Sequence, residues 1–480
     1  MEMNKIVEKR EWMILGIGVI GIGIVVIWRM LHWVWLRPKK LERLLRAQGF
    51  RGNSYGGRRL LFGDMRDNIS LIRLAHSSPI PLSVSHNILP RVIPFLHHSI
   101  DLHGKKCFVW HGPIPRVNIM EPAVIKEVLT KQYDLPKLKS NPLVNLLTTG
   151  LAKYDGQKWT KHRRIVNPAF HLEKLKCMLS AFSLCCSEIV SKWEKEVSTH
   201  PEGSCELNLW PDIEAFSGDV ISRTAFGSSY KEGRRIFQLQ KEQADLTIRA
   251  INSVYIPGWR FLPTKRNRRM KRICKEVYAL LGEMVSKRVK AMKAGEAVNN
   301  DLLDLLLESN FRENEEHGNN KRLGMSIKEV IEECRLFYLA GQETTSALIA
   351  WTLVLLGKHQ NWQQQARQEV LKVFGHCEPT FDGLSQLKIV SMILNEVLRL
   401  YPPVVVLIRT IEEDLKVGGF ELPAGVQISI PTVAIHHDEE IWGEDAKEFK
   451  PERFAKGFQM RQVQRTKCRI CHSDGDPRSA

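Results

Sequence analysis

The sequence predicts a mainly α-helical protein with a small β portion, preceded by a transmembrane helix at the N-terminus. Three observations predict this fold class: an uncharged apolar run near the N-terminus, short β-branched and aromatic pieces between turn signals, and long segments in which apolar residues recur every three or four positions. The chain has 480 residues, of which 43% are hydrophobic. That length and composition can bury a large core.

Charge and cysteine content narrow the function classes. The net charge of +17 comes from 70 Lys and Arg against 53 Asp and Glu, and the positive residues are dispersed along the chain. A dispersed charge favours an anionic membrane surface or an acidic electron donor as partner, and no nucleic acid. The ten cysteines form no dense framework, which indicates free thiols in a reducing compartment.

The N-terminal element is the predicted membrane anchor, residues 1–36. The run from Met13 to Trp28 is uncharged and continues from Met30 to Leu36, which reaches the roughly 20 residues that a spanning helix requires. Positive charge is in excess directly after the run, so the body of the protein is expected on the cytosolic side. The alternative is a cleavable signal peptide, but Arg29, His32 and three tryptophans stand where a small-residue cleavage site belongs.

The body begins with a predicted small sheet and continues into helices. Residues 38–120 contain the pieces Cys107-Phe-Val-Trp110 and Val117-Asn-Ile119, with a turn signal at His111-Gly-Pro113. From 121 to 310 the spacing is helical. Residues 310–324 are polar without periodicity, which predicts an exposed linker.

A long core helix follows the predicted linker. Ser326-Ile-Lys-Glu329 is a capping box, and apolar residues recur until Gly357, over a length of roughly 45 Å. Its centre reads Ala340-Gly-Gln-Glu-Thr-Thr-Ser346, in which Gly341, Thr344 and Thr345 are weaker helix formers and Glu343 is expected to bring a carboxylate into a buried stripe. Gly341 is expected to let a ligand approach, and the Thr344 hydroxyl to bond a backbone carbonyl or a bound oxygen species. The alternative is a kink whose polar groups are satisfied locally.

Further motifs lie before and after this helix, and their order and separation are specific. Trp159-Thr-Lys-His-Arg163 places an indole and a guanidinium four residues apart, and Glu396 and Arg399 share a helix face. Tyr401-Pro-Pro403 ends that second helix, and the later pieces are Arg409 and Pro451-Glu-Arg-Phe454. With these motifs the chain resembles the cytochrome P450 haem-thiolate monooxygenases. Residues 35–42 and 48–52 look most like the plant clan that contains secologanin synthase.

The resemblance implies a cytochrome P450-like fold that binds haem b. Trp159, Arg163 and Arg409 would hold the haem propionates, and Ala340 and Gly341 would line the cofactor. Glu343 and Thr344 would be catalytic and relay protons to the oxygen that the cofactor activates. The structural triad would consist of Glu396, Arg399 and Arg453.

The same resemblance implies partners and a location. Electrons would come from NADPH-cytochrome P450 reductase, and O2 and an apolar small molecule of the plant specialised-metabolite or hormone class would react. The protein would be a single-pass protein of the endoplasmic reticulum membrane, with its catalytic body facing the cytosol. The alternative to a propionate-binding role for Arg409 is that it is an ordinary surface residue of a strand.

The resemblance ends after Gly457. The family continues into a loop with the pattern Phe-x-x-Gly-x-Arg-x-Cys-x-Gly, whose thiolate binds the iron. Cys471 is a weak candidate for that metal ligand, because Arg469 matches but the phenylalanine and glycine positions do not, and nothing around Cys468 matches. We therefore expect an incomplete haem domain at 37–457, followed by an aberrant polar tail at 458–480 from splicing, a frameshift or read-through.

Two further hypotheses concern this tail. A catalytically inactive truncated form without the iron ligand is the alternative to an active enzyme. Cys468-Arg-Ile-Cys471-His472 also fits the pattern of covalent c-type haem attachment, or half of a zinc site without a clear partner pair, and chance is the favoured reading.

Overall fold

The computed structural model describes residues 2–77, 79, 86–131, 135–138, 142–251, 259–295, 301–316 and 324–455. The chain divides into two compact units. The first contains residues 1–79, 90–128 and 408–430, and the second contains 80–89, 129–407 and 431–480. The predictions for the tail at 458–480, with Cys468 and Cys471, fall outside the described residues.

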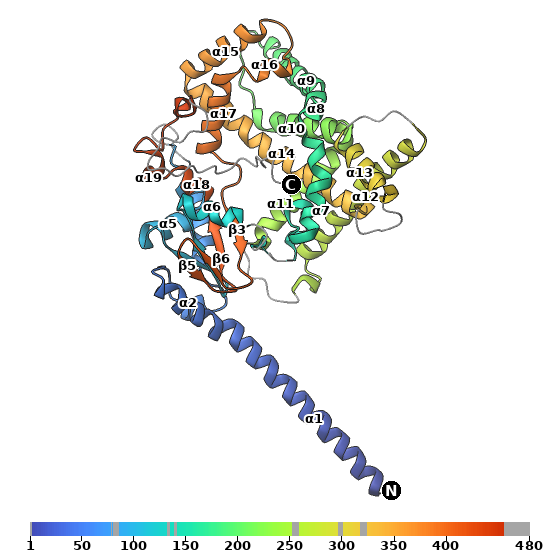
Figure 1. The fold of residues 1–480 in the computed structure, drawn as a ribbon, viewed down its shortest axis with the longest axis vertical. Coiled ribbons are helices and arrows are strands. Elements are labelled where there is room, and N and C mark those ends of the chain that lie inside the picture. The colour runs from blue at the N-terminus through green and yellow to red at the C-terminus, as the bar shows by residue number, and fades with distance from the viewer. Residues whose placement is uncertain are drawn as a thin grey trace. The chain divides into compact units, whose positions relative to one another are not determined.

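The first unit holds the N-terminal helix and the strands (Figure 1). Its helices are α1 (Glu2–Leu31), the π-helix η1 (His32–Leu36), α2 (Arg37–Ala47), η2 (Gly57–Arg59), α3 (Met65–Ser77), α4 (Leu89–Val92), α5 (Pro94–His103) and most of α6 (Pro122–Thr130). Its strands are β1 (Phe108–His111), β2 (Ile114–Asn118), β3 (Leu407–Thr410), β4 (Leu415–Val417), β5 (Phe420–Leu422) and β6 (Gln427–Ile430).

The second unit is helical in the part that the structure describes. Its α-helices are α7 (Gly156–Val166), α8 (Leu172–Cys177), α9 (Leu179–Ser198), α10 (Leu209–Phe226), α11 (Tyr230–Ile251), α12 (Lys265–Lys293), α13 (Leu302–Glu316), α14 (Ile327–Lys358), α15 (Gln360–Phe374), α16 (Phe381–Leu384), α17 (Lys388–Leu400), α18 (Thr432–His436) and α19 (Glu439–Trp442). Its short 3-10 turns are η3 (Val144–Leu146), η4 (Gly150–Ala152), η5 (Asn167–Phe170), η6 (Trp259–Phe261) and η7 (Pro451–Phe454). This mainly α composition with a small sheet confirms the predicted fold class.

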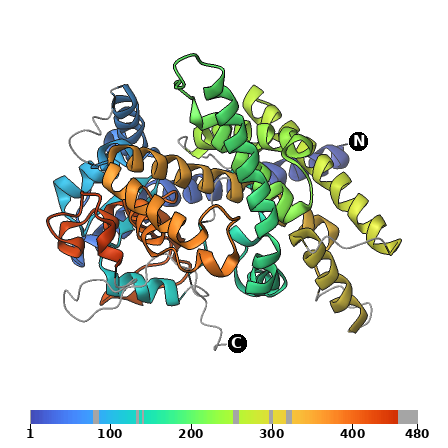
Figure 2. The same cartoon turned by 90° about the horizontal axis from the view of Figure 1, so that it is seen from above.

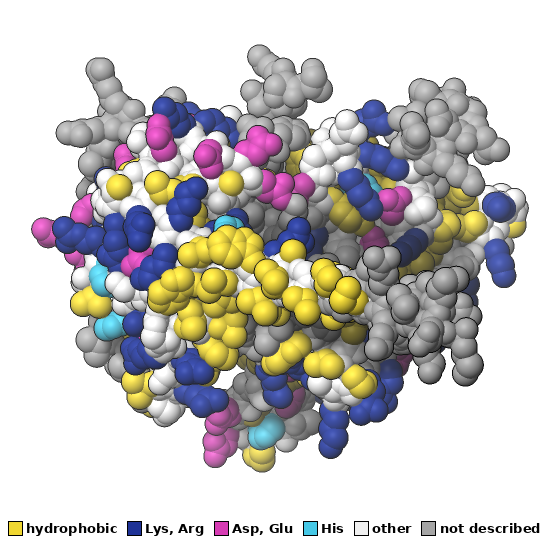
Figure 3. All heavy atoms as spheres, turned by 90° about the horizontal axis from the view of Figure 1, so that it is seen from below, with side chains coloured by type: hydrophobic (Ala, Val, Ile, Leu, Met, Phe, Trp, Pro, Cys, Tyr) yellow, Lys and Arg dark blue, Asp and Glu magenta, His cyan; other side chains and the backbone are white. Residues whose placement is uncertain are grey.

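The predicted apolar run is helical throughout. The segment Ile17–Ala47 is long and apolar enough to cross a membrane, and it lies near the N-terminus. Its apolar side chains are exposed from Ile17 to Leu31. Figure 3 shows apolar side chains gathered on one face of the molecule. The core helix α14 also meets the same criteria of length and composition.

Strands β1 and β2 belong to the predicted small sheet and form an antiparallel hairpin. They pair antiparallel from Phe108 opposite Val117 to His111 opposite Ile114, and the sheet continues in the order β1-β2-β6-β3. β2 and β6 are parallel, with Arg116 opposite Gln427, and the Arg116 guanidinium donates to the Gln427 side-chain oxygen at 2.8 and 3.0 Å. The β4–β5 hairpin forms a separate two-stranded sheet.

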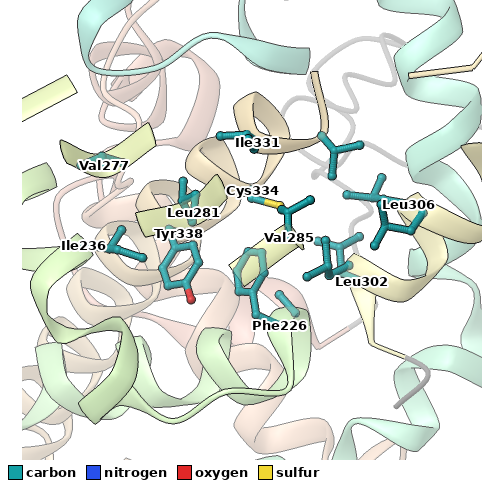
Figure 4. Close-up of a cluster of buried hydrophobic side chains, with 14 of the residues drawn as sticks. Phe226, Ile236, Val277, Leu281, Val285, Leu302, Leu306, Ile331, Cys334 and Tyr338 are labelled. Atoms are coloured by element: carbon teal, nitrogen blue, oxygen red, sulfur yellow. The ribbon is translucent and has the colours of Figure 1, made fainter. Parts of the chain in front are cut away.

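A large buried cluster lies around the N-terminal half of α14 (Figure 4). Cys334 and Tyr338 of α14 are fully buried there, and the Tyr338 ring stacks on Phe226 with the two ring centroids 4.2 Å apart. Apolar side chains of α12 and α13 complete the cluster, among them Val277, Leu281, Val285, Leu302 and Leu306. The buried half of α14 is thereby fixed by neighbours from several helices, as the two views in Figures 1 and 2 show.

The ends of α14 and α13 test two predictions. Ser326 caps α14 with the expected capping box, because its hydroxyl accepts from the Glu329 N–H while the Glu329 carboxylate accepts from the Ser326 N–H. The predicted start of the linker is wrong, since α13 continues through Glu316. Residues 317–323 lie outside the described residues.

Candidate functional site

Helix α7 presents the predicted pair Trp159 and Arg163 one turn apart, both half-buried. Lys137, from a loop before η3, places its ammonium 5.6 Å from the Trp159 ring centroid. The same ammonium donates to the carbonyls of Leu151 at 2.9 Å and Tyr154 at 2.7 Å. This region therefore combines an indole N–H, a guanidinium and an ammonium, which are donors that suit the carboxylates of a ligand.

A buried pair joins α7 to α14. His162 Nδ1 lies 2.6 Å from Glu333 Oε1, and both side chains have no exposed surface. The other carboxylate oxygen of Glu333 accepts from the Leu151 N–H at 3.1 Å. Gly150 has φ +69°, and a Cβ there would lie 2.8 Å from the same oxygen. The glycine therefore allows the backbone of η4 to approach a carboxylate that would otherwise be blocked.

Further acidic groups surround this pair. Glu329 accepts from the Ser326 N–H and lies 3.1 Å from the Lys158 ammonium. Burial opposes its ionisation, but these two partners outweigh burial and lower the pKa of Glu329 to about 2. The Tyr278 hydroxyl donates to Glu332 Oε1 at 2.8 Å, and burial together with that carboxylate raises the pKa of Tyr278 to about 12.

The centre of α14 is open on one side. Ala340, Glu343 and Thr344 are exposed, and the Thr344 hydroxyl donates to the Ala340 carbonyl at 2.7 Å. The expectation that Glu343 lies in a buried stripe is therefore wrong. Ala340 and Thr344 are small and lie one turn apart, so they leave a face on which a flat group can rest. The hydrogen bond from the Thr344 hydroxyl to a backbone carbonyl is one of the two roles expected for Thr344.

Gly341 faces a neighbouring helix. A Cβ at this position would lie 2.7 Å from Cγ1 of Ile221 on α10. A side chain at position 341 would point toward α10 and not toward a ligand. The expectation that Gly341 is a glycine in order to let a ligand approach is therefore wrong. The glycine instead permits close packing of α10 and α14, which the 2.6 Å contact between the Ser217 and Ser346 hydroxyls reinforces.

Charged residues of α10 and α11 influence Glu343. Partial desolvation and the carboxylates of Glu214 and Asp245 raise the pKa of Glu343, while Lys241 opposes them. The Lys241 ammonium is itself paired with Glu214, with Nζ 2.6 Å from Oε1. A carboxyl group with a raised pKa exchanges protons more readily near neutral pH than an ordinary one.

The structure brings Glu396, Arg399 and Arg453 together. The Arg399 guanidinium donates to both Glu396 oxygens, at 2.7 and 2.8 Å, and Arg453 Nε lies 3.5 Å from Glu396 Oε1. Arg399 also donates to the carbonyls of His436, Ala446 and Glu448. Glu396 is fully buried. The cluster thus fixes α17 to the segment from α18 to η7 and uses its buried charges structurally.

Arg409 lies on β3 in the first unit, whereas Trp159, Arg163 and Glu343 lie in the second. Its side chain is half-buried and donates to the Ile408 carbonyl at 3.1 Å. Its expected role at a propionate stays a prediction.

The second unit fits part of the expected cofactor. The α7 region offers donors for carboxylates, and the Ala340–Thr344 face offers small side chains for a ring. In the described ranges, no three His, Cys, Asp or Glu side chains form a metal-binding group. Cys471, the weak candidate for the thiolate ligand, lies outside those ranges.

Two features of this site, Lys137 and the His162–Glu333 pair, belong to no sequence motif and were not predicted from the sequence. Lys137 lies in a loop, 22 positions before Trp159, and nothing in its local pattern distinguishes it. The His162–Glu333 pair joins residues far apart in sequence. Glu332 and Glu333 do carry one signal, because two carboxylates on a largely apolar helix need buried partners.

Several known proteins are similar to this chain over most of its length. The family model described as cytochrome P450 matches residues 95–467. Cytochrome P450 CYP72A219 of Panax ginseng is 56% identical over 431 residues, which cover 90% of this chain and 82% of the relative. The 7-deoxyloganic acid hydroxylase of Catharanthus roseus is 53% identical, with shares of 90% and 82%, and secologanin synthase 2 of the same plant is 51% identical, with shares of 90% and 81%.

Proposed function

The chain belongs to the cytochrome P450 family, and we propose that it is a membrane-bound, haem-dependent monooxygenase that hydroxylates an apolar plant metabolite. Family membership implies haem b as the cofactor, and O2, a reductase and an organic substrate as reaction partners. The observation that carries the proposal for this chain is the centre of α14. There Thr344 and Glu343 stand side by side next to small residues, and the pKa of Glu343 is raised.

Each expected residue has a defined task in this proposal. Haem, when bound, supplies the oxygen activation by which one atom of O2 enters the substrate and the other leaves as water. Trp159 and Arg163 hold the propionates, a role that the family resemblance also gives to Arg409, and Ala340 borders the ring. Glu343 takes protons from solvent and passes them to the Thr344 hydroxyl, which holds them at the reaction centre.

The names of the relatives support a substrate class. Two of them are named for acting on 7-deoxyloganic acid and for making secologanin. We infer that this chain acts on a plant specialised metabolite with an apolar carbon skeleton. Residues 135–147 and 404–407 are candidates for substrate contacts, and Leu135, Leu143 and Val144 are buried and apolar.

The location and the electron donor are further parts of the proposal. Residues 1–36 anchor the chain in the endoplasmic reticulum membrane, and residues 37–457 form the catalytic body on the cytosolic side. NADPH-cytochrome P450 reductase supplies the electrons. The exposed apolar surface of Ile17–Leu31 and the excess of positive charge after Leu36 support the anchor and its orientation.

The first test is the carbon monoxide difference spectrum of the reduced, purified full chain beside a Cys471→Ala variant. The proposal expects bound haem b with a Soret band in the thiolate position. If the band is present in the unmodified chain and absent in Cys471→Ala, Cys471 is the iron ligand. A folded protein that takes up no haem would contradict the proposal and favour the catalytically inactive form.

A second test separates proton delivery from haem binding. Thr344→Ala is expected to lower product formation by about 10²-fold or more while electrons from NADPH are diverted into free hydrogen peroxide. Thr345→Ala, which removes the adjacent exposed hydroxyl, is the matched control and should retain the ratio of product to NADPH. Equal losses in both variants would mean that the hydroxyl of Thr344 has no special role.

A further inference from the structure

An aromatic stack joins the C-terminal half of α14 to the end of α17, and the two helices pack against each other (Figure 1). The Trp351 indole of α14 lies almost parallel to the ring of Tyr401, the residue that directly follows α17. The two ring centroids are 3.8 Å apart, and the angle between the ring planes is 13°. Tyr401 is 3% exposed, so water has little access to its ring. Because the two π systems overlap, an electron can pass between the rings.

The hydroxyl of Tyr401 has a basic partner. Its oxygen lies 2.6 Å from Nδ1 of His86, a buried residue that precedes α4. Burial, together with the positive charge of Lys358, lowers the pKa of His86 to about 4, so its ring is neutral near pH 7. Burial also raises the pKa of Tyr401, so the phenol keeps its proton. The phenol O–H is therefore the donor of this hydrogen bond, and the unprotonated Nδ1 is the acceptor.

The stack begins on the same side of α14 as the residues proposed for oxygen chemistry. Trp351 follows Thr344 by seven positions, which is close to two helical turns, so both side chains project from one face of the helix. The rise along the helix axis over that spacing is about 10 Å. A separation of this order permits electron transfer between the centre of α14 and the indole.

A second buried tyrosine of the chain has the indole but not the base. The ring centroid of Tyr55 lies 4.6 Å from that of Trp110, and the Tyr55 hydroxyl accepts from the Leu61 N–H at 3.2 Å. Among the described residues, no basic side chain pairs with this hydroxyl. Tyr55 shows that a tyrosine can be buried beside a tryptophan with a backbone group as its partner. The histidine at Tyr401 is therefore not a requirement of burial.

We propose that Trp351, Tyr401 and His86 form a redox-active site that gives one electron to a high-potential one-electron oxidant at the centre of α14. The oxidant takes an electron from the Trp351 indole, and the indole takes one from Tyr401. As Tyr401 is oxidised, its O–H bond breaks and the proton moves to His86 Nδ1. The net change is the loss of one electron and one proton by the phenol, which leaves a neutral phenoxyl radical beside a protonated His86. A thiol or ascorbate in solution returns the electron, and His86 returns the proton.

The base is the part of the site that makes this oxidation favourable. A phenol that has lost an electron is a strong acid, so it needs an acceptor for its proton within hydrogen-bond distance. The site gives an oxidant that meets no substrate an alternative to attack on nearby protein groups. Its role as electron donor rests on the proposed oxygen chemistry, in which bound haem supplies the oxidant. The redox activity of the three side chains does not depend on that proposal.

The test generates the oxidant with light. The purified full chain is illuminated with ruthenium tris(bipyridine) and a cobalt(III) quencher, then frozen, and electron paramagnetic resonance measures the yield of tyrosyl radical. The yield is expected to fall several-fold in Tyr401→Phe. The matched control is Tyr55→Phe, which removes a buried hydroxyl beside a tryptophan that has no basic partner, and it should retain the signal.

The decisive variant is His86→Gln. Glutamine keeps an oxygen that accepts the hydrogen bond from Tyr401, but an amide does not hold a proton, so the radical yield should fall several-fold while the melting temperature changes little. Trp351→Phe keeps a stacked ring that is harder to oxidise, and transient absorption should show slower formation of the radical. Formation in the unmodified chain should also slow in D2O, and this isotope effect tests the proton transfer without any variant.

Three outcomes would overturn the proposal. Equal tyrosyl signals in the unmodified chain and in Tyr401→Phe would place the oxidation at another residue. A full signal in His86→Gln, or the same rate in D2O and H2O, would mean that the proton does not move to His86. An unchanged rate in Trp351→Phe would exclude the indole as the relay. Because the ruthenium complex supplies the oxidant, these results do not require bound haem, and the carbon monoxide spectrum tests the oxygenase proposal separately.

Discussion

Polar side chains at the centre of α14 are tolerated for different reasons. The hydroxyls of Thr344 and Ser346 donate to the carbonyls one turn earlier, of Ala340 and Gln342, and so need no other partner. Glu343 has no such local solution, and neighbouring carboxylates disfavour its charge. A residue that is electrostatically unfavourable in the folded state and stands beside a hydroxyl is typical of sites where function opposes stability.

Glu343→Gln is expected to stabilise the fold at neutral pH while it lowers turnover. The pKa of Glu343 is raised in the folded state above its ordinary value of 4.5. The folded state therefore holds the proton more tightly, so the group favours folding at low pH, and this contribution is lost as the pH rises through the raised pKa. Glutamine removes the penalty that the charged form causes at higher pH.

Melting temperatures of the variant and the wild type at about pH 4 and about pH 7 test this expectation. The gain should be seen at the higher pH and shrink at the lower one. Glu283→Gln changes an exposed glutamate on α12 and should give no such dependence. The same shift for Glu343→Gln at both values would contradict the electrostatic explanation.

At the scale of elements, close approach of α10 and α14 depends on a missing side chain. Gly341 faces Ile221, while Gln342 donates from its amide to the Glu214 carbonyl at 3.1 Å. Serine hydroxyls of the two helices meet at 2.6 Å nearby. The contact with α10 holds the centre of α14 in place. It uses the side of α14 that lies away from the exposed residues Ala340, Glu343 and Thr344.

Gly341→Ala is expected to destabilise the protein by about 1–3 kcal/mol, because its methyl group would overlap Ile221. The gain in helix propensity, about 1 kcal/mol, opposes this loss and does not exceed it. Chemical denaturation of Gly341→Ala, Ile221→Ala and the double variant measures the coupling, because Ile221→Ala removes both Cγ1 and Cδ1, the two nearest atoms. The double variant should be more stable than the sum of the two single losses predicts, and simple additivity would show that the two side chains do not conflict.

The His162–Glu333 pair connects α7 to the buried end of α14. Glu333→Ala is expected to destabilise by about 3–5 kcal/mol, since it leaves the buried His162 ring and the Leu151 N–H without their acceptor. Glu333→Gln keeps the shape and an acceptor oxygen, so its loss should be smaller. Denaturant titration monitored by circular dichroism distinguishes them, and equal losses would show that packing, not hydrogen bonding, sets the cost.

At the scale of the whole molecule, local sequence patterns predicted the ends of helices well where residues next to one another in the sequence determine where a helix begins or ends. The capping box at Ser326 marked the start of α14, and Tyr401-Pro-Pro403 marked the end of α17. The linker prediction failed at residues 310–316, since the apolar start of α13 supports a helix that its polar end merely extends.

Contacts between distant segments were beyond the sequence. Trp159 and Arg163 were found from their spacing, but the position of Lys137 depends on the path of a loop. The neighbour of Gly341 likewise depends on how α10 crosses α14. The sequence therefore identified residues one helical turn apart, whereas the reason for a residue whose partner lies on another helix required the three-dimensional structure.

The proposed anchor and the dispersed positive charge of the chain predict two separable kinds of membrane attachment. The full chain should stay in the membrane fraction at high salt, because a spanning helix of roughly 20 apolar residues holds through burial in lipid. Deletion of residues 2–28 should leave attachment to anionic vesicles at low salt that is released at about 1 M salt. In the described part of this segment from Ile17 to Trp28 no side chain is buried, so the fold should persist, as its melting temperature will report. Retention of the deleted form at high salt would show that apolar contacts outside α1 suffice to hold the protein in the membrane.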